Sequence, residues 1–211
     1  MYPKRQNKSR GMTFLEITVV MSIFAIVSSI TIFNYKTFQA KVDIRNLTND
    51  IASKFTQAQR RALFGDLHPQ GGADWRPAYG LSFDLNTGAD TDNKTFYYFV
   101  DLDQGRDFDA GVYDCAPYGT GECLEKISIT RGDSIQSLEV YFEGDPTPQQ
   151  ITSRLDIVYT RPNAGALITS PEILEPLVAP ISYARIQIAS GQNGGLTTSI
   201  LVYASGRIQI N

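Results

Sequence analysis

The amino-acid sequence predicts an α+β protein, in which one long N-terminal helix is followed by an antiparallel β domain. Two observations lead to this prediction. Residues 12–64 form an apolar run and then an amphipathic run, with no glycine or proline between them. Residues 65–211 contain short segments of alternating apolar residues, separated by Gly, Pro, Asn or Asp. A helix followed only by strands is typical of an α+β fold with an antiparallel sheet against the helix.

The first element is an uncharged, apolar segment with the length of a membrane-spanning helix. Residues 17–35 carry no charged side chain, and we expect the whole span to cover residues 12–35. The ten residues at the N-terminus include four basic and no acidic side chains, which favours a cytoplasmic N-terminus. Glu16 lies just inside the apolar segment. A carboxylate in hydrocarbon costs several kcal/mol unless it has a partner, so a functional role is expected for it.

These residues resemble the cleavage motif of type IV pilins and of the pseudopilins of type II secretion. The resemblance rests on Gly11, Met12, Phe14 and Glu16, the last at the fifth place after the glycine, followed by about twenty mostly apolar residues. It implies that residues 1–11 are a leader peptide, that prepilin peptidase cleaves after Gly11, and that the new amine of Met12 is methylated. It also implies that Glu16, with Phe14 beside it, acts in filament assembly by neutralising that amine on an adjacent subunit. Met12 departs from the phenylalanine that is usual in the family.

Two other interpretations of the N-terminal segment compete with this one. A cleaved secretory signal has a shorter apolar core and small residues at its end, for which Val27, Ser28 and Ser29 are the candidates. An ordinary signal anchor accounts for the basic leader and the apolar run. Neither alternative gives Glu16 a role.

The second half of the helix, residues 36–64, has an apolar stripe at three- and four-residue steps, while charged residues occupy the other faces. The pattern predicts one helix from about Met12 to Phe64, with this half packed against the β domain. Gly65 and the Pro- and Gly-containing stretch after His68 are expected to end it. The residues of the stripe are Ile44, Leu47, Ile51, Phe55, Ala58 and Ala62.

The remaining residues, 65–211, are expected to form the extracytoplasmic β domain. Ser205 and Gly206 predict a hairpin between the last two strands. The expected strands are Ala78–Asp84, Thr95–Asp101, Lys126–Thr130, Ser137–Phe142, Leu155–Thr160, Ile181–Ala189, Thr197–Ala204 and Arg207–Ile210.

The C-terminal half resembles, more loosely, the H-type minor pseudopilins and related minor pilins. The similar segments are a strand at Leu155–Thr160, a Pro- and Gly-containing turn at residues 161–165, and a terminal Gly-Arg hairpin at residues 200–210.

The two cysteines, Cys115 and Cys123, lie eight residues apart in a stretch with glycine and proline. Outside the cytoplasm this spacing predicts one disulfide that closes a short loop. The alternative, a metal-binding pair, has only His68 to complete its ligand set.

Four aspartates alternate after the second expected strand, namely Asp101, Asp103, Asp107 and Asp109, with Gly105 among them. Carboxylates at alternate positions around a glycine are typical of a Ca²⁺-binding loop, although the spacing is not that of an EF-hand. A similar spacing occurs at residues 84–92. The competing interpretation is two solvated acidic turns. Calcium at this loop is the candidate cofactor.

Charge and missing motifs narrow the function. Without the leader, the chain has 15 basic and 22 acidic residues, a formal net charge of −7. This balance disfavours nucleic acid as the main partner, because phosphate binding requires concentrated Lys and Arg. The sequence contains no phosphate-binding loop, HExxH motif or zinc spacing. Because it contains a single histidine, any Ser-His-Asp or Cys-His catalytic arrangement would have to include His68.

We therefore predict a structural subunit and not an enzyme, namely a minor pilin of a type IV pilus or a minor pseudopilin of a type II secretion system. The expected partners are prepilin peptidase, other subunits and the inner-membrane assembly platform. The expected location is the inner membrane, with the β domain outside the cytoplasm, and then the filament. A DNA-uptake minor pilin and a membrane-anchored enzyme are the alternative functions.

Overall fold

The structure is a computed structural model, which describes residues 11–72, 75–86, 92–109, 115, 121–162, 164–173, 179–191 and 195–211. The expected leader, apart from Gly11, lies outside the described residues. The chain divides into two compact units, Met1–Gln39 and Ala40–Asn211. Every buried hydrophobic side chain of the described residues belongs to Ala40–Asn211, so this unit contains its own core.

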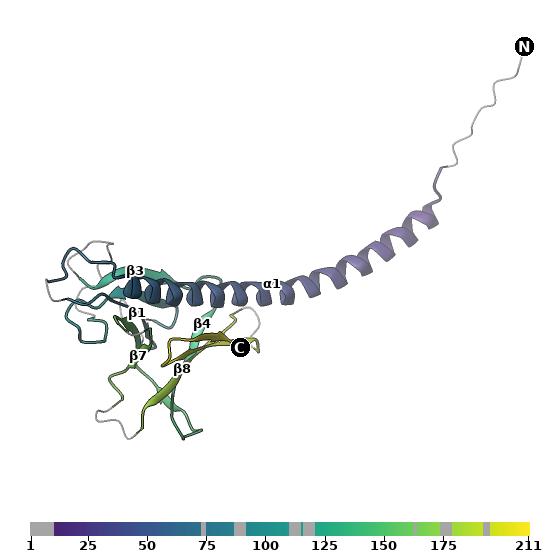
Figure 1. The fold of residues 1–211 in the computed structure, drawn as a ribbon. Helices are drawn as coiled ribbons and strands as arrows, with labels where there is room; N and C mark the ends of the chain where they lie inside the picture. The colour runs from purple at the N-terminus through teal and green to yellow at the C-terminus, as the bar shows by residue number, and fades with distance from the viewer. Residues whose placement is uncertain are drawn as a thin grey trace, which may run out of the picture. The chain divides into compact units, whose positions relative to one another are not determined.

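Helix α1 spans Phe14–Phe64, close to the predicted range (Figure 1). It begins two residues later than expected because Thr13 is its N-cap: the Glu16 backbone N–H donates to Thr13 Oγ1 at 3.3 Å. It ends at Gly65, whose φ of +75° is the left-handed conformation that glycine adopts without steric cost. The amides of Gly65 and Asp66 donate back to the carbonyls of Ala62 and Arg61, which is the Schellman arrangement.

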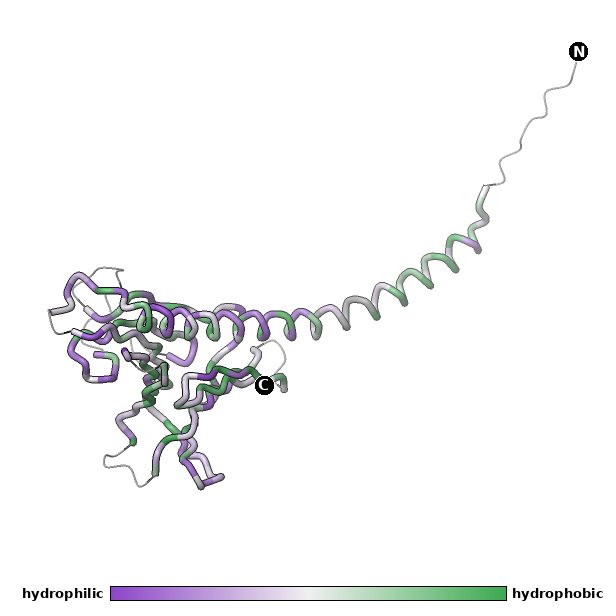
Figure 2. The backbone as a smooth tube through the Cα atoms, viewed as in Figure 1, coloured by the Kyte–Doolittle hydropathy of each residue, from purple (hydrophilic) through white to green (hydrophobic). Residues whose placement is uncertain are grey.

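In the first unit, the apolar side chains of α1 are exposed. From Phe14 to Ile30 the large hydrophobic residues have between 44% and 87% of their surface accessible in the isolated chain. The corresponding part of α1 is mostly hydrophobic in Figure 2. In the described part of the chain, no helix meets the combined length and hydropathy expected of a membrane span.

Two five-stranded antiparallel sheets make up the rest of the second unit (Figure 1). The first sheet has the order β3-β2-β1-β6-β7, with β1 Ala78–Asp84, β2 Thr95–Val100, β3 Cys123–Ser128, β6 Arg154–Thr160 and β7 Ala166–Thr169. The second has the order β10-β9-β8-β4-β5, with β4 Ser134–Phe142, β5 Gln149–Ile151, β8 Ile181–Ala189, β9 Thr197–Tyr203 and β10 Ile208–Ile210.

The predicted α+β class is confirmed, and all eight expected strands have a counterpart. Two short strands, β5 and β7, were not expected from the sequence. Each is an edge strand of three or four residues, too short for an alternating pattern to be recognised. Strand β3 begins at Cys123, earlier than predicted, because its first residues pair with β2 across a bulge between Tyr98 and Phe99.

The main core lies among the C-terminal half of α1 and the inner faces of both sheets. The predicted stripe of α1 is buried there, apart from the partly buried Leu47. The rings of Phe55 on α1 and Phe83 on β1 lie 5.8 Å apart between centroids. Polar contacts supplement this packing: Lys54 of α1 pairs with Glu125 of β3, and Arg131 pairs with the buried Asp43 of α1.

A second, smaller cluster covers the opposite face of the first sheet. All six residues of β2 are buried, because Phe96, Tyr98 and Val100 face the main core while Tyr97 and Phe99 face the small cluster. Phe108 covers this cluster, and its ring centroid lies 5.2 Å from those of Tyr97 and Phe99. Strand β2 is therefore buried on both faces because the loop after it folds back over the sheet.

The predicted disulfide between Cys115 and Cys123 is present. Cys123 is the first residue of β3 and is fully buried in the small cluster, against which Cys115 packs. The same cluster explains Gly80 of β1. A Cβ at this position would lie 2.6 Å from the carbonyl oxygen of Ile157 and 2.9 Å from the ring of Phe99.

Candidate functional site

The N-terminal motif lies at the start of α1 and is open to solvent. Gly11 precedes the helix, and a Cβ built on it would meet no atom within 4 Å. Met12 is 63% and Phe14 is 87% exposed. The peptide bond between Gly11 and Met12 therefore belongs to a non-helical segment, and no side chain of the described residues packs against Gly11.

Glu16 occupies the third position of α1, after the N-cap Thr13. Thr-x-x-Glu is the pattern of a capping box, and an acidic side chain in the first turn also interacts favourably with the helix dipole. Sequence reasoning missed this role of Thr13, although the spacing could have shown it. Glu16 remains exposed, so its carboxylate is accessible to a group on another chain.

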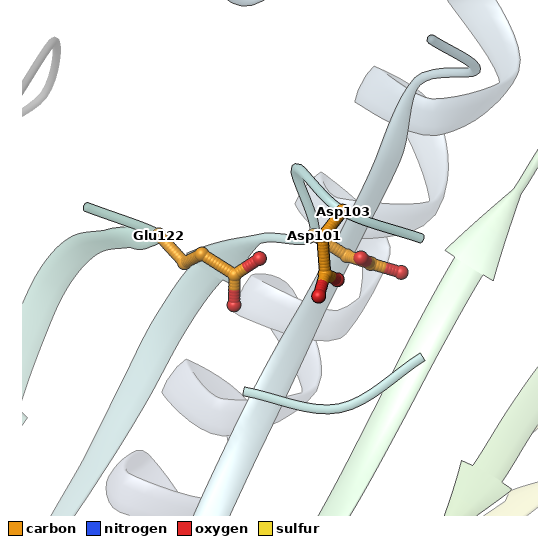
Figure 3. A group of neighbouring side chains, drawn as sticks. All are labelled: Asp101, Asp103 and Glu122. Atoms are coloured by element: carbon orange, nitrogen blue, oxygen red, sulfur yellow. The ribbon is translucent and has the colours of Figure 1, made fainter. Parts of the chain in front are cut away.

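The acidic loop after β2 brings together three carboxylates, and one of them was not expected. Ligand oxygens of Asp101, Asp103 and Glu122 all lie within 4.8 Å of one another (Figure 3). Asp101 and Glu122 are only 2% and 6% exposed, whereas Asp103 is exposed. Among the described residues, this is the one such group of potential metal ligands.

The other two predicted ligands lie outside this cluster. Asp107 forms an ion pair with Arg154, with Oδ2 and Nη2 3.1 Å apart. Asp109 is exposed, and its backbone N–H donates to Glu122 Oε2 at 2.8 Å. The similar spacing at residues 84–92 falls partly outside the described residues.

Pairing between two strands brings Glu122 to this cluster. The Val100 backbone N–H, at the end of β2, donates to the Glu122 carbonyl oxygen at 2.9 Å. The Glu122 carboxylate then accepts hydrogen bonds from the backbone N–H groups of Leu102 and Asp109. Glu122 and Asp101 are far apart in the sequence, so no motif of short spacing contains both. The register of β2 and β3 brings them together, so reading the loop alone could not have found Glu122.

Burial perturbs the two enclosed acids. Desolvation raises the pKa of Glu122 to about 7, although its two backbone hydrogen bonds act in the opposite direction. Desolvation likewise raises the pKa of Asp101 to about 6. Asp101 Oδ2 accepts a hydrogen bond from the Arg106 backbone N–H at 3.1 Å. Its Oδ1 is buried and has no hydrogen-bond partner among the described residues.

Asp156 contacts the other end of the acidic loop after β2, at Phe108. It projects from β6 on the face that carries Phe108, and the Phe108 backbone N–H donates to its Oδ2 at 3.3 Å. Arg154 Nε lies 2.9 Å from the same oxygen, and this arginine also pairs with Asp107. Asp156 is fully buried, and desolvation raises its pKa to about 6 despite the neighbouring arginine.

Asp156→Asn should remove a pH dependence of stability that the native protein has. With a pKa near 6 when folded and 3.8 when unfolded, Asp156 binds more protons in the native state, so its contribution to stability falls as the pH rises through this range. Between about pH 4.5 and about pH 7.5, the free energy of unfolding of Asp156→Asn should gain about 2 kcal/mol relative to wild type. Urea unfolding at several pH values, in a buffer with a chelator, measures this. A constant difference between the two proteins would contradict a raised pKa at this position.

Comparison with known families gives a match at the N-terminus. Residues 6–32 match the prokaryotic N-terminal methylation motif. No curated protein and no solved structure matches the chain significantly. The matched segment includes the predicted cleavage site and Glu16, followed by most of the exposed apolar part of α1. The chain thus carries the methylation motif of proteins that prepilin peptidase processes. This match supports a broad relationship to type IV pilins and pseudopilins.

Proposed function

We propose that the protein is a minor pilin or minor pseudopilin, a structural subunit of a type IV pilus or of a type II secretion pseudopilus. The methylation motif at residues 6–32 carries this proposal, since it occurs at the start of a long helix with a β domain beyond it. The motif indicates a structural subunit rather than an enzyme.

The exposed apolar part of α1 supports assembly as the function. Its large hydrophobic side chains from Phe14 to Ile30 form a surface far more apolar than soluble monomers present to water. Such a surface requires lipid or other protein to cover it. We propose that residues 12–35 lie in the inner membrane before assembly and in the filament core afterwards, with residues 65–211 outside the cytoplasm.

The proposed role of Glu16 follows from charge in an apolar medium. An isolated carboxylate in hydrocarbon is destabilised by several kcal/mol, and a cationic amine beside it removes most of that cost. Cleavage after Gly11 would create such an amine at Met12. Pairing of this amine with Glu16 of an adjacent subunit would favour transfer from lipid into the filament and set the axial position of each new subunit.

The similarity to H-type minor pseudopilins remains part of the proposal. The expected terminal hairpin is present as β9 and β10, which pair between Val202 and Ile208 at the turn. Gly206 has a φ of +86° in this turn, and its amide donates to the Tyr203 carbonyl oxygen. The hairpin is compatible with the H-type resemblance, but strand pairs of this kind occur in many β domains.

A DNA-uptake minor pilin is the second candidate function, and one surface favours it. The rings of Tyr141, Tyr183 and Tyr203 follow one another across β4, β8 and β9 on the side of the sheet away from the core, with centroids 4.4 and 5.3 Å apart. Arg207 lies over the Tyr203 ring at 3.8 Å. Aromatic rings with arginine are used by single-strand binders. However, Glu139 pairs with Arg185 on this face, and the chain is acidic without its leader, so structural assembly is favoured.

Glu16→Leu should leave membrane insertion intact and strongly reduce incorporation into filaments. The substitution makes the segment more apolar and removes the charge that the neighbouring amine would meet. The measurement compares the amounts of subunit in sheared filaments and in the membrane fraction. Wild-type incorporation of the variant would show that the pairing role is wrong.

Glu16→Gln is the matched variant, because glutamine also serves in a capping box but carries no charge. We expect it to assemble as poorly as Glu16→Leu. If Glu16→Gln assembles normally while Glu16→Leu does not, helix capping and not charge pairing is the role of Glu16.

A further inference from the structure

We propose that Asp101, Asp103 and Glu122 form a binding site for a divalent cation, and that the cation is Ca²⁺. This site goes beyond the assembly function and does not depend on it. The three carboxylates come from two segments that β2 and β3 hold together, with ligand oxygens within 4.8 Å of one another (Figure 3). In the described part of the chain, no Lys or Arg forms an ion pair with any of the three.

A second observation points to a missing partner at this cluster. Asp101 is 98% buried, and its Oδ1 has no hydrogen-bond partner in the described part of the chain. A buried carboxylate oxygen without a partner is costly, and far more so with two other carboxylates beside it. The other oxygen of Asp101 and both oxygens of Glu122 are held by backbone N–H groups, which fixes the direction of these side chains. A cation among the three would satisfy Oδ1 and remove the mutual repulsion.

The chemistry of the ligands selects calcium. All three residues supply hard oxygen donors, which suit Ca²⁺ and Mg²⁺, whereas Cys115 and Cys123 are joined in a disulfide. Two oxygens bound to one Ca²⁺ can be up to about 5 Å apart, because Ca–O distances reach about 2.6 Å. The corresponding limit for Mg²⁺ is about 4 Å. Oxygens within 4.8 Å of one another are close enough to share one cation, and Ca²⁺, with its longer bonds and flexible geometry, needs less adjustment of the side chains than Mg²⁺ does.

A bound ion would also stabilise the loop that carries Phe108 over the small hydrophobic cluster. The segment from Asp101 to Asp109 leaves the cation site and carries Phe108, which packs on Tyr97 and Phe99. At its far end Asp109 donates its backbone N–H to Glu122, one of the three ligands. The ion would thus join both ends of the loop to the start of β3, so its removal should loosen the loop before the main core.

An arginine side chain is the alternative to a metal ion as the positive charge that neutralises Asp101. Arg76, Arg106 and Arg161 line a small cleft of about 150 Å³ together with Asp101. If one of these arginines neutralised Asp101 in solution, the carboxylates would need no metal, and calcium would bind weakly or not at all. The experiment must therefore distinguish a metal-neutralised from an arginine-neutralised cluster.

The single tryptophan provides a local probe for this experiment. Trp75 is buried, and its Nε1–H donates to the Asp101 backbone carbonyl oxygen at 2.7 Å. Tb³⁺ replaces Ca²⁺ at oxygen sites and emits when a nearby excited indole transfers energy to it. The full chain in detergent micelles should show saturable Tb³⁺ emission on selective excitation of tryptophan, and Ca²⁺ should displace it at lower concentrations than Mg²⁺.

Three variants determine whether the signal comes from this cluster. Glu122→Gln and Asp101→Asn should reduce the affinity for Tb³⁺ at least about tenfold, because each removes one of three charges from the ligand set. Asp109→Asn, an exposed carboxylate in the same loop, is the matched control and should bind Tb³⁺ like wild type. Equal binding by wild type and Glu122→Gln would overturn the proposal, and so would loss of binding in the Asp109→Asn control alone.

Thermal unfolding gives a readout that is independent of the probe. At about a hundred times its Kd, Ca²⁺ should raise the Tm of the wild-type chain by roughly 5–10 °C, and Mg²⁺ should raise it less. Asp103→Asn, whose side chain is exposed, should fold normally and lose most of this shift. A wild-type Tm that millimolar Ca²⁺ does not change would show that arginine or water, and not a metal, serves these carboxylates.

Discussion

Gly11→Val is expected to yield a chain that keeps its leader, whereas we expect the wild-type protein to begin at N-methylated Met12. Valine in place of glycine restricts the backbone before the cleaved bond and adds a β-branched side chain beside it, which should hinder binding by the peptidase. The structure separates this effect from misfolding. Among the described residues, nothing lies within 4 Å of a Cβ at Gly11, and the residue precedes α1, so valine disturbs no contact in that part of the chain.

Mass spectrometry of the N-terminal peptide measures this result directly. Met12→Phe is the matched control, because it changes the other side of the same bond to the residue usual in pilins, and it should be cleaved and methylated. An intact leader in the wild-type protein would contradict the pilin interpretation. Cleavage near Ser29 would instead support a secretory signal.

Phe55→Ala is expected to produce the largest loss of stability, about 3–5 kcal/mol. Phe55 is completely buried in the middle of the core, with its ring 5.8 Å from that of Phe83. Truncation leaves a cavity between α1 and β1 that β1 cannot move to fill, because antiparallel pairing with β2 on one side and β6 on the other holds it in place. Chemical denaturation measures the change in the free energy of unfolding.

Phe64→Ala is the control for this prediction, since it removes the same ring from the same helix. Phe64 is 76% exposed, so its truncation should change stability by no more than about 0.5 kcal/mol. A similar loss in both variants would show that the C-terminal half of α1 is not packed in the core as described.

The raised pKa values of the buried acids and the metal proposal concern one loop but are tested separately. The Asp156→Asn experiment uses a chelator and reports a proton equilibrium at the β6 end of the loop. The Tb³⁺ experiment reports ion binding at the β3 end, where Glu122 lies. The two can therefore succeed or fail independently.

The sequence by itself determined the elements whose signals are local. The range of α1 followed from an uninterrupted helical pattern ended by Gly65, and the bounds of β1 and β8 followed from apolar residues enclosed by turn residues. The N-terminal motif and the cysteine pair were likewise visible, because each depends on spacing along the chain. These features arise from backbone preferences and side-chain periodicity over a few residues.

Only the tertiary structure decided which distant segments meet. The strands divide into two sheets according to which strands pair, and the local sequence does not indicate these partners. The short edge strands β5 and β7 depend on such pairing in the same way. The candidate metal site shows the same limit: Asp101 and Asp103 were expected together, but Glu122 joined them through the register of β2 and β3. Side chains far apart in the chain become neighbours because strand pairing aligns their backbones, and that alignment is a property of the whole sheet.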